Sequence, residues 1–365
     1  MNSLTGNIGR RQFISAGSMA IGAGLAVQTS RLSFAAGRLS PQEPPAGGAP
    51  PQEAGLQSAA GGPPMQMSRT IKDDGTKYGK YIIFSEKSEG NDRGVPVANT
   101  IGMNSIIPEY PMALINRMMP PGPLPGKKAP ERHSLSEYII HLGNNPDDPM
   151  DLCADVTFCL GTGKWREKYI FNQATAVYVP AGFWHCPTSM KNIKRPVEFV
   201  NLMIGSPKTG FGETDHQPDV SEEEMAKAKT NDYLFSNYMV SGVGKDMKDP
   251  KGGKWIAYLD CSKIAQAPLT RIIRYGSEEA SYPILETVQT HEYGTLLIQL
   301  GTDSNDATAL GAELELYLGE EKEKHTISKS AIVYVPPKIP HGPMVVKNAT
   351  QPFNFLEVVM GPELP

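Results

Sequence analysis

Histidine and glutamate side chains recur in this chain at spacings that suit a metal site. Glu137 follows His133 by four residues, and Glu131 stands two residues before His133. A later strand-like run, "VYVPAGFWHC", reaches Pro180 and presents His185 five residues further on. Two imidazoles and one carboxylate can hold a divalent transition metal and leave coordination positions open for substrate or water. His133, Glu137 and His185 are therefore the predicted metal ligands, and Glu131 is a candidate catalytic base or fourth ligand.

These side chains can share an ion only if the chain bends between them. On one straight strand His133 and Glu137 would lie about 13 Å apart, at roughly 3.3 Å per residue. Pro180 closes the later strand because it has no N–H for the ladder, and Gly182 permits a tight turn. The turn directs His185 into the fold. The alternative is a sealed polar core that holds no metal.

The body of the chain is a duplication. "HSLSEYIIHLG" (133–143) aligns without gaps on "HEYGTLLIQLG" (291–301), at an offset of 158 residues. "PVEFVNLMIG" (196–205) aligns on "PFNFLEVVMG" (352–361) at an offset of 156 residues. Since only two copies exist and each is far longer than a solenoid repeat, the pattern predicts two tandem domains.

Each copy is a series of short β-branched and aromatic runs separated by Gly, Pro, Asn and Asp. Examples are "YIIHLG", "DVTFCLG", "EKYIFN" and "AVYVP". Such a series is typical of an all-β sandwich or barrel. The one helical candidate, "SEEEMAKAKTNDYLF" (221–235), begins with a capping serine and three acids, and predicts a short linker helix between the copies.

The two motifs resemble the signatures of the cupin family: His-x-His followed by Glu, and later Pro-x-Gly-x-x-His. Pro180 to His185 meets the second in full, whereas Glu131 replaces the leading histidine of the first. The resemblance covers about residues 70–365. It implies two tandem cupin barrels, each a double-stranded β-helix or jelly roll with a site inside its cup. The expected domains are 69–206 and 207–365.

The second copy keeps two histidines but differs around them. Its candidate site consists of Gln289, His291 and His341, and Thr295 stands where the first copy has Glu137. Neutral ligands leave the charge of an enclosed ion uncompensated, which is costly in a cavity of low dielectric constant. The second cup is therefore expected to be structural and empty, or occupied only when an anionic ligand enters with the ion.

The resemblance also implies a class of activity. Bicupin relatives include oxalate decarboxylases and quercetin-type dioxygenases. The expectation is an enzyme of the decarboxylase or dioxygenase type that acts on a small organic acid or an oxygenated aromatic. One divalent metal would sit in the N-terminal cup, with iron(II) favoured and manganese, nickel, zinc and cobalt as alternatives. The competing hypothesis is a non-catalytic bicupin that binds or stores a small ligand or a metal.

The N-terminal residues resemble a twin-arginine export signal. Arg10 and Arg11 precede a Gly/Ala-rich run over 16–27, which is too short for a stable membrane span. We expect a signal peptide over 1–36, with an uncut anchor as the alternative, and a disordered Pro/Gly-rich tether over 37–68. The mature protein would act in the periplasm or elsewhere outside the cytoplasm.

Composition limits the partners. A net charge of −4 over 365 residues, with no basic tract, argues against nucleic acid. Four cysteines are too few for a disulfide scaffold, and sequence alone does not select a pairing. The expected partner is a small-molecule substrate or ligand, with no stable membrane span in the mature protein. A homo-oligomer stays an open alternative.

Overall fold

The computed structural model describes most of the chain after residue 69. Outside the description lie 1–69 and 362–365, and the internal stretches 72–73, 87–90, 93–94, 97–98, 103–111, 122–129, 134, 162–165, 205–234, 244–245, 261–263, 265–266, 278–280 and 307. The expected signal peptide and tether, and nearly all of the expected linker helix, fall in these stretches. No helix of the described part is long and apolar enough to cross a bilayer.

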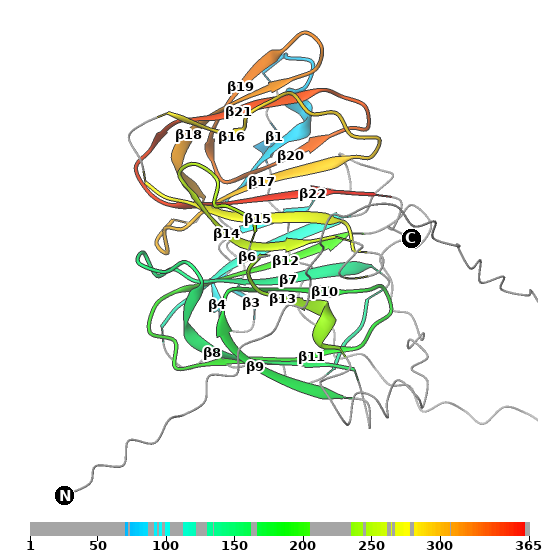
Figure 1. Ribbon diagram of the computed structural model, residues 1–365, viewed down its shortest axis with the longest axis vertical. Coiled ribbons are helices and arrows are strands. Elements are labelled where there is room, and N and C mark those ends of the chain that lie inside the picture. Colours follow the sequence, from blue (N-terminus) through cyan, green and yellow to red (C-terminus); the bar gives the residue numbers. More distant parts are fainter. Residues whose placement is uncertain are drawn as a thin grey trace, which may run out of the picture. The chain divides into compact units, whose positions relative to one another are not determined.

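The N-terminal barrel consists of two antiparallel sheets (Figure 1). The larger has the order β13-β10-β7-β12-β6-β5 and the smaller has the order β11-β8-β9. Their bounds are β5 (Asn99–Gly102), β6 (Met112–Met119), β7 (Ser136–Leu142), β8 (Asp151–Leu160), β9 (Glu167–Gln173), β10 (Thr175–Val179), β11 (His185–Lys191), β12 (Val197–Ile204) and β13 (Met239–Val240). A separate pair of two-residue strands, β3 (Asn91–Asp92) and β4 (Val95–Pro96), precedes β5.

The C-terminal barrel repeats this arrangement. Its larger sheet has the order β1-β2-β20-β17-β22-β15-β14, and its smaller sheet has the order β16-β21-β18-β19. Their bounds are β1 (Thr70–Ile71), β2 (Ile82–Phe84), β14 (Gly253–Leu259), β15 (Leu269–Tyr275), β16 (Tyr282–Leu285), β17 (Thr295–Gly301), β18 (Ala309–Leu318), β19 (Glu323–Lys329), β20 (Ala331–Val335), β21 (His341–Ala349) and β22 (Phe353–Val359). The run β10-β7-β12-β6-β5 corresponds to β20-β17-β22-β15-β14, so the predicted duplication and all-β fold are confirmed.

The central strands β7 and β17 are buried along their whole length. Both lie inside the larger sheets, where both faces are covered, so they contain runs such as "YII" and "LLI" without polar alternation. Residues at equivalent positions of the two copies contact each other. The Asn144 side chain donates to the Thr302 carbonyl at 2.9 Å, and the Asn354 side chain donates to Glu198.

Each barrel also receives an edge strand from the segment that precedes the other. β2 follows a short 3-10 helix (Gly79–Tyr81) and pairs with β20 of the C-terminal barrel. β13 follows the equivalent 3-10 helix (Ser236–Tyr238) and pairs with β10 of the N-terminal barrel. The expected domain limit at residues 206 and 207 lies outside the described residues and stays a prediction.

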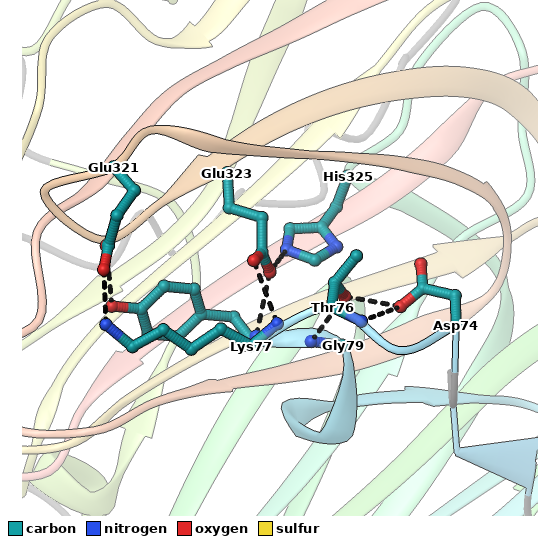
Figure 2. A network of polar contacts seen from close by, with 8 residues as sticks. Asp74, Thr76, Lys77, Gly79, Glu321, Glu323 and His325 are labelled. Atoms are coloured by element: carbon teal, nitrogen blue, oxygen red, sulfur yellow. Dashed lines mark hydrogen bonds and ion pairs between the residues drawn. The ribbon is translucent and has the colours of Figure 1, made fainter.

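The segment 74–84, which we call the strap, is fixed to the C-terminal barrel by the pairing of β2 with β20 and by the carboxylates of Glu321 and Glu323 (Figure 2). The backbone N–H groups of Lys77 and Tyr78 donate to Glu323 at 2.9 and 2.8 Å. His325 Nε2 lies 2.9 Å from the same carboxylate. Burial alone would raise the pKa of Glu323, but these donors hold it below its usual range. Gly319, at φ +74°, leaves room for the Tyr78 ring, which a Cβ there would meet at 2.4 Å.

Replacing Glu323 with glutamine is expected to loosen the strap. The two backbone N–H groups donate to different oxygens of Glu323, and glutamine replaces one of these oxygens with an NH₂ group, which cannot accept. A hydrogen bond to a charged group contributes about 2 kcal/mol. Tryptic cleavage after Lys77 and Lys80 should accelerate. Glu315→Gln is the control, because its partner Lys324 is largely exposed. Equal cleavage of the two variants would contradict this role of Glu323.

Candidate metal centres

The four residues predicted for the first site come together where the two sheets of the N-terminal barrel meet. We call Glu131, His133, Glu137 and His185 the N-terminal cup. Glu131 and His185 form an isolated antiparallel bridge, with backbone hydrogen bonds of 2.8 and 2.9 Å. The Gly182 N–H donates to the His133 carbonyl at 2.7 Å. The turn that closes with Gly182, at φ +77°, thus brings His185 beside the Glu131–His133 segment.

Glu137 reaches the same place from the other sheet. It lies on β7, after the chain has left the Glu131–His185 bridge and entered the larger sheet. Its Oε2 is 3.9 Å from His133 Nε2 and 3.0 Å from His185 Nε2. The expected bend between His133 and Glu137 is therefore present.

Two lone pairs face each other in this cup. His185 Nδ1 lies 3.3 Å from the Phe183 carbonyl, which can only accept, so we assign the ring proton to Nδ1 and the lone pair to Nε2. The Asn201 amide donates to Glu137 Oε1, which leaves Oε2 to face His185. Both facing atoms are buried and neither makes a hydrogen bond of proper geometry to a described residue. A cation between them would satisfy both, so the donor set fits a divalent metal.

The protonation state of Glu137 agrees with that arrangement. Burial would raise the pKa of its carboxyl, but the Asn201 amide and the attraction of the His185 and His133 imidazoles, which acts when they are protonated, outweigh burial and lower the pKa. A divalent ion between Glu137 and His185 would supply the same attraction while both imidazoles stay neutral. Glu137 is therefore a carboxylate at neutral pH, the form that binds a metal.

Glu131 is the more accessible carboxylate of the cup. Its side chain is 24% exposed, against 1% for Glu137. Glu131 Oε1 lies 3.6 Å from His185 Nε2 and accepts from the Cys186 thiol at 3.3 Å. Glu131, His133 and His185 can each offer one ligand atom, with all three atoms within 4.8 Å of one another. The position suits either role expected for Glu131, a fourth ligand or a proton carrier.

The second barrel brings His291 and His341 together with a residue that the sequence analysis missed, Glu357 of β22. We call Gln289, His291, His341 and Glu357 the C-terminal cup. One ligand atom from each of His291, His341 and Glu357 lies within 4.8 Å of the others. The expectation that this cup lacks a carboxylate is therefore wrong. Glu357 stands in the apolar run "FNFLEVV", and an acid within a fully buried strand was the available signal.

The histidine turn is also intact in the second barrel. Lys338 replaces the glycine of the motif, yet it adopts φ 63°, and its N–H donates to the His291 carbonyl at 2.8 Å. Burial lowers the pKa of His341 to about 4 and also lowers the pKa of His291. Both imidazoles are therefore neutral at pH 7, as a metal ligand must be.

From the sequence, Trp165, Phe183 and Trp184 could line the mouth of the N-terminal cup, with core packing as the alternative. Phe183 packs on Phe235 and Tyr238, so an aromatic cluster supports the turn that carries His185. The Trp184 ring lies under the Arg132 guanidinium at 4.6 Å. Cys153, Cys159 and Cys186 form no disulfide. His325 aligns with Tyr169 of the first copy, which makes it a possible third imidazole of the second site, but it belongs to the strap contact instead. His216, Trp165 and Cys261 lie outside the described residues.

No family model and no curated protein sequence matches this chain. Among solved structures, oxalate decarboxylase from Bacillus subtilis at pH 4.6 has 13% identity and a TM-score of 0.45, over 76% of each chain. A second structure of this enzyme, described for its Mn(II) centres, has 14% identity and a TM-score of 0.42, over 72% of each chain. Likeness at this level carries no argument about the present chain, whose fold and sites rest on the strand order and distances above.

Proposed function

We propose that this chain is a metal-dependent enzyme of the cupin type, which acts on a small organic acid or an oxygenated aromatic in the N-terminal cup. One observation supports this most: the buried Glu137 Oε2 and His185 Nε2 face each other at 3.0 Å with no hydrogen bond. Such a pair is costly in a sealed core but suits a site that holds a cation. His133, Glu137 and His185 would hold the ion.

A bound divalent metal would supply Lewis acidity toward a carboxylate or enolate oxygen, or a binding position for O₂. The protein's own part is positioning and proton handling. Asn201 and the Phe183 carbonyl fix the orientation of Glu137 and His185. Glu131 is open enough to meet a substrate and close enough to His185 to act beside the ion. Its carboxylate would take or return the substrate proton, which makes it the proposed catalytic residue.

The metal and the substrate are proposed as classes. Iron(II) remains the first choice for two imidazoles with carboxylates, and manganese(II), nickel, zinc and cobalt can use the same donors. Elemental analysis of the purified protein would identify the ion. The substrate panel should contain phenolic and dicarboxylic acids, with oxalate among them, and O₂ uptake and CO₂ release should be followed together.

Glu131→Gln is expected to keep the N-terminal ion but lose turnover. The amide preserves size and polarity and removes the base, so kcat should fall by about 10²- to 10⁴-fold. Metal content and kcat measured on the same sample would test this. Loss of the ion in Glu131→Gln would make Glu131 a ligand rather than the base.

The second candidate function is a bicupin that binds or stores a small ligand or a metal without chemistry. It rests on the same cup, since a set of ligands does not require turnover. A metal-loaded protein that leaves the whole panel unchanged, yet binds one of its members in calorimetry, would favour this function.

We also propose that the protein is exported by the twin-arginine route and acts in the periplasm or elsewhere outside the cytoplasm. The Arg10-Arg11 signature and the small residues Ser33 and Ala35 support this. Fractionation of the native host, with N-terminal sequencing of the mature chain, would test it. An uncleaved cytosolic protein would contradict the proposal.

A further inference from the structure

The buried carboxylate that faces the two histidines occupies different strands in the two barrels. In the first barrel Glu137 lies on β7 and Asn201 lies on the neighbouring strand β12. The equivalent residues of the second barrel are Thr295 on β17 and Glu357 on β22. The carboxylate has thus moved to the adjacent strand, and a short polar side chain has replaced it at the first position.

The support of the carboxylate has moved with it. In the N-terminal cup the Asn201 amide holds one oxygen of Glu137, and the other oxygen faces the histidines. In the C-terminal cup Arg271 Nη1 donates to Glu357 Oε2 at 2.8 Å, and Oε1 lies 4.0 Å from His291 Nε2. Arg271 pairs across β15 and β22 with Glu357, at the register position where the first barrel has Ile115 opposite Asn201.

The C-terminal cup also contains buried atoms without hydrogen-bond partners among the described residues. These are Glu357 Oε1, His341 Nε2 and the Thr295 hydroxyl. His341 Nδ1 lies 3.2 Å from the Ile339 carbonyl, so we assign the proton to Nδ1 and the lone pair to Nε2. A buried carboxylate oxygen and a buried imidazole lone pair therefore converge beside His291, as in the other cup.

We propose that the C-terminal cup is a second divalent-metal site, with His291, His341 and Glu357 as ligands and Arg271 as the residue that orients Glu357. Two imidazole nitrogens and one carboxylate oxygen suit a first-row transition metal. The second ion should bind more weakly than the first. The N-terminal cup has two carboxylates, whereas Glu357 shares its charge with Arg271, and Gln289 stands where the first barrel has Glu131.

Metal counting on the full chain tests the proposal. After loading with manganese(II) and removal of excess, the wild type is expected to hold two ions, and Glu357→Gln is expected to hold one. Titration should show the second dissociation constant raised at least about 100-fold in Glu357→Gln, because removal of an outer partner alone typically weakens a metal 10- to 100-fold. Glu315→Gln, a carboxylate on the outer face of β18, is the control and should keep both ions.

An exchange variant separates ligation from folding. Thr295→Glu combined with Glu357→Asn returns the carboxylate to the strand used by the first barrel, and it should restore the second ion that Glu357→Gln loses. A wild type whose single ion is retained in Glu357→Gln, or a Glu357→Gln variant that still holds two ions, would overturn the proposal. The N-terminal site is assessed separately, since turnover by Glu357→Gln reports on that cup alone.

Discussion

Replacing His185 with alanine is expected to remove the ion from the N-terminal cup and abolish turnover. The imidazole is fully buried and its Nε2 lies within 4 Å of both carboxylates of the cup, 3.6 Å from Glu131 and 3.0 Å from Glu137. Without it, His133 is the remaining imidazole among these four residues. The affinity for the first ion should fall more than about 100-fold, beyond the effect of losing an outer partner.

His341→Ala is the matched control, because His341 begins β21 as His185 begins β11. Metal analysis and activity should be measured on both variants, with circular dichroism to confirm the β fold. His341→Ala is expected to keep the first ion and the activity. The opposite pattern, in which His341→Ala loses activity and His185→Ala does not, would place the catalytic site in the other barrel.

The sequence was informative about the fold because the fold is periodic. Short apolar runs between turn residues predicted strands, and the nearly constant offset of 156 to 158 residues between the copies predicted two tandem barrels. The Pro-x-Gly turn and the position of His185 were predictable for the same reason: they depend on local backbone constraints. The exchange of β2 and β13 was not predictable, because it joins segments about 250 residues apart in one barrel and leaves no local pattern.

The candidate sites were predictable where their residues lie in the motifs, and not elsewhere. Glu357 was missed because its counterpart in the first copy, Asn201, is not among the predicted ligands. Lys338 stands where the first copy has Gly182, but a non-glycine residue can hold a positive φ when tertiary contacts fix it, at a cost of about 1 kcal/mol. A comparison of single aligned positions does not detect a carboxylate that has been replaced by one on the neighbouring strand.

His141 is the clearest case in which the residue type was misleading. Its alignment with Gln299 of the second copy predicts an ordinary hydrogen-bonded histidine. The ring is instead fully buried against Phe158, Phe171 and Phe199, at centroid distances of 6.4, 5.4 and 5.2 Å. Neither ring nitrogen has a hydrogen-bond partner among the described residues. Burial without a counter-charge lowers the pKa of His141 to about 3.

This histidine is expected to make the fold sensitive to acid. Below pH 6.5 the unfolded chain binds a proton at this ring, whereas the ring of the folded protein stays neutral until about pH 3. The free energy of unfolding should therefore fall as pH decreases through that window, by about 1.4 kcal/mol per pH unit and about 3 kcal/mol by pH 4. Above pH 7 the contribution is independent of pH.

His141→Met should remove that dependence. Methionine is similar in size and packs well against aromatic rings. At pH 7 the variant should gain about 1–3 kcal/mol, the cost of a buried polar group without a partner. The gain should increase by about 3 kcal/mol more at pH 4. Urea unfolding of the metal-free proteins at several pH values would measure it, since the acid response of the other histidines is common to both proteins and cancels.

Gln299→Met is the matched control for this pH dependence. Gln299 occupies the equivalent position on β17, is fully buried, and has no hydrogen-bond partner for either amide atom among the described residues. Its side chain does not titrate, so Gln299→Met should gain the same 1–3 kcal/mol at every pH. A growing gain for His141→Met beside a constant gain for Gln299→Met would identify proton exclusion as the cause. Parallel gains would mean that His141 is protonated in the folded protein or hydrogen-bonded through water.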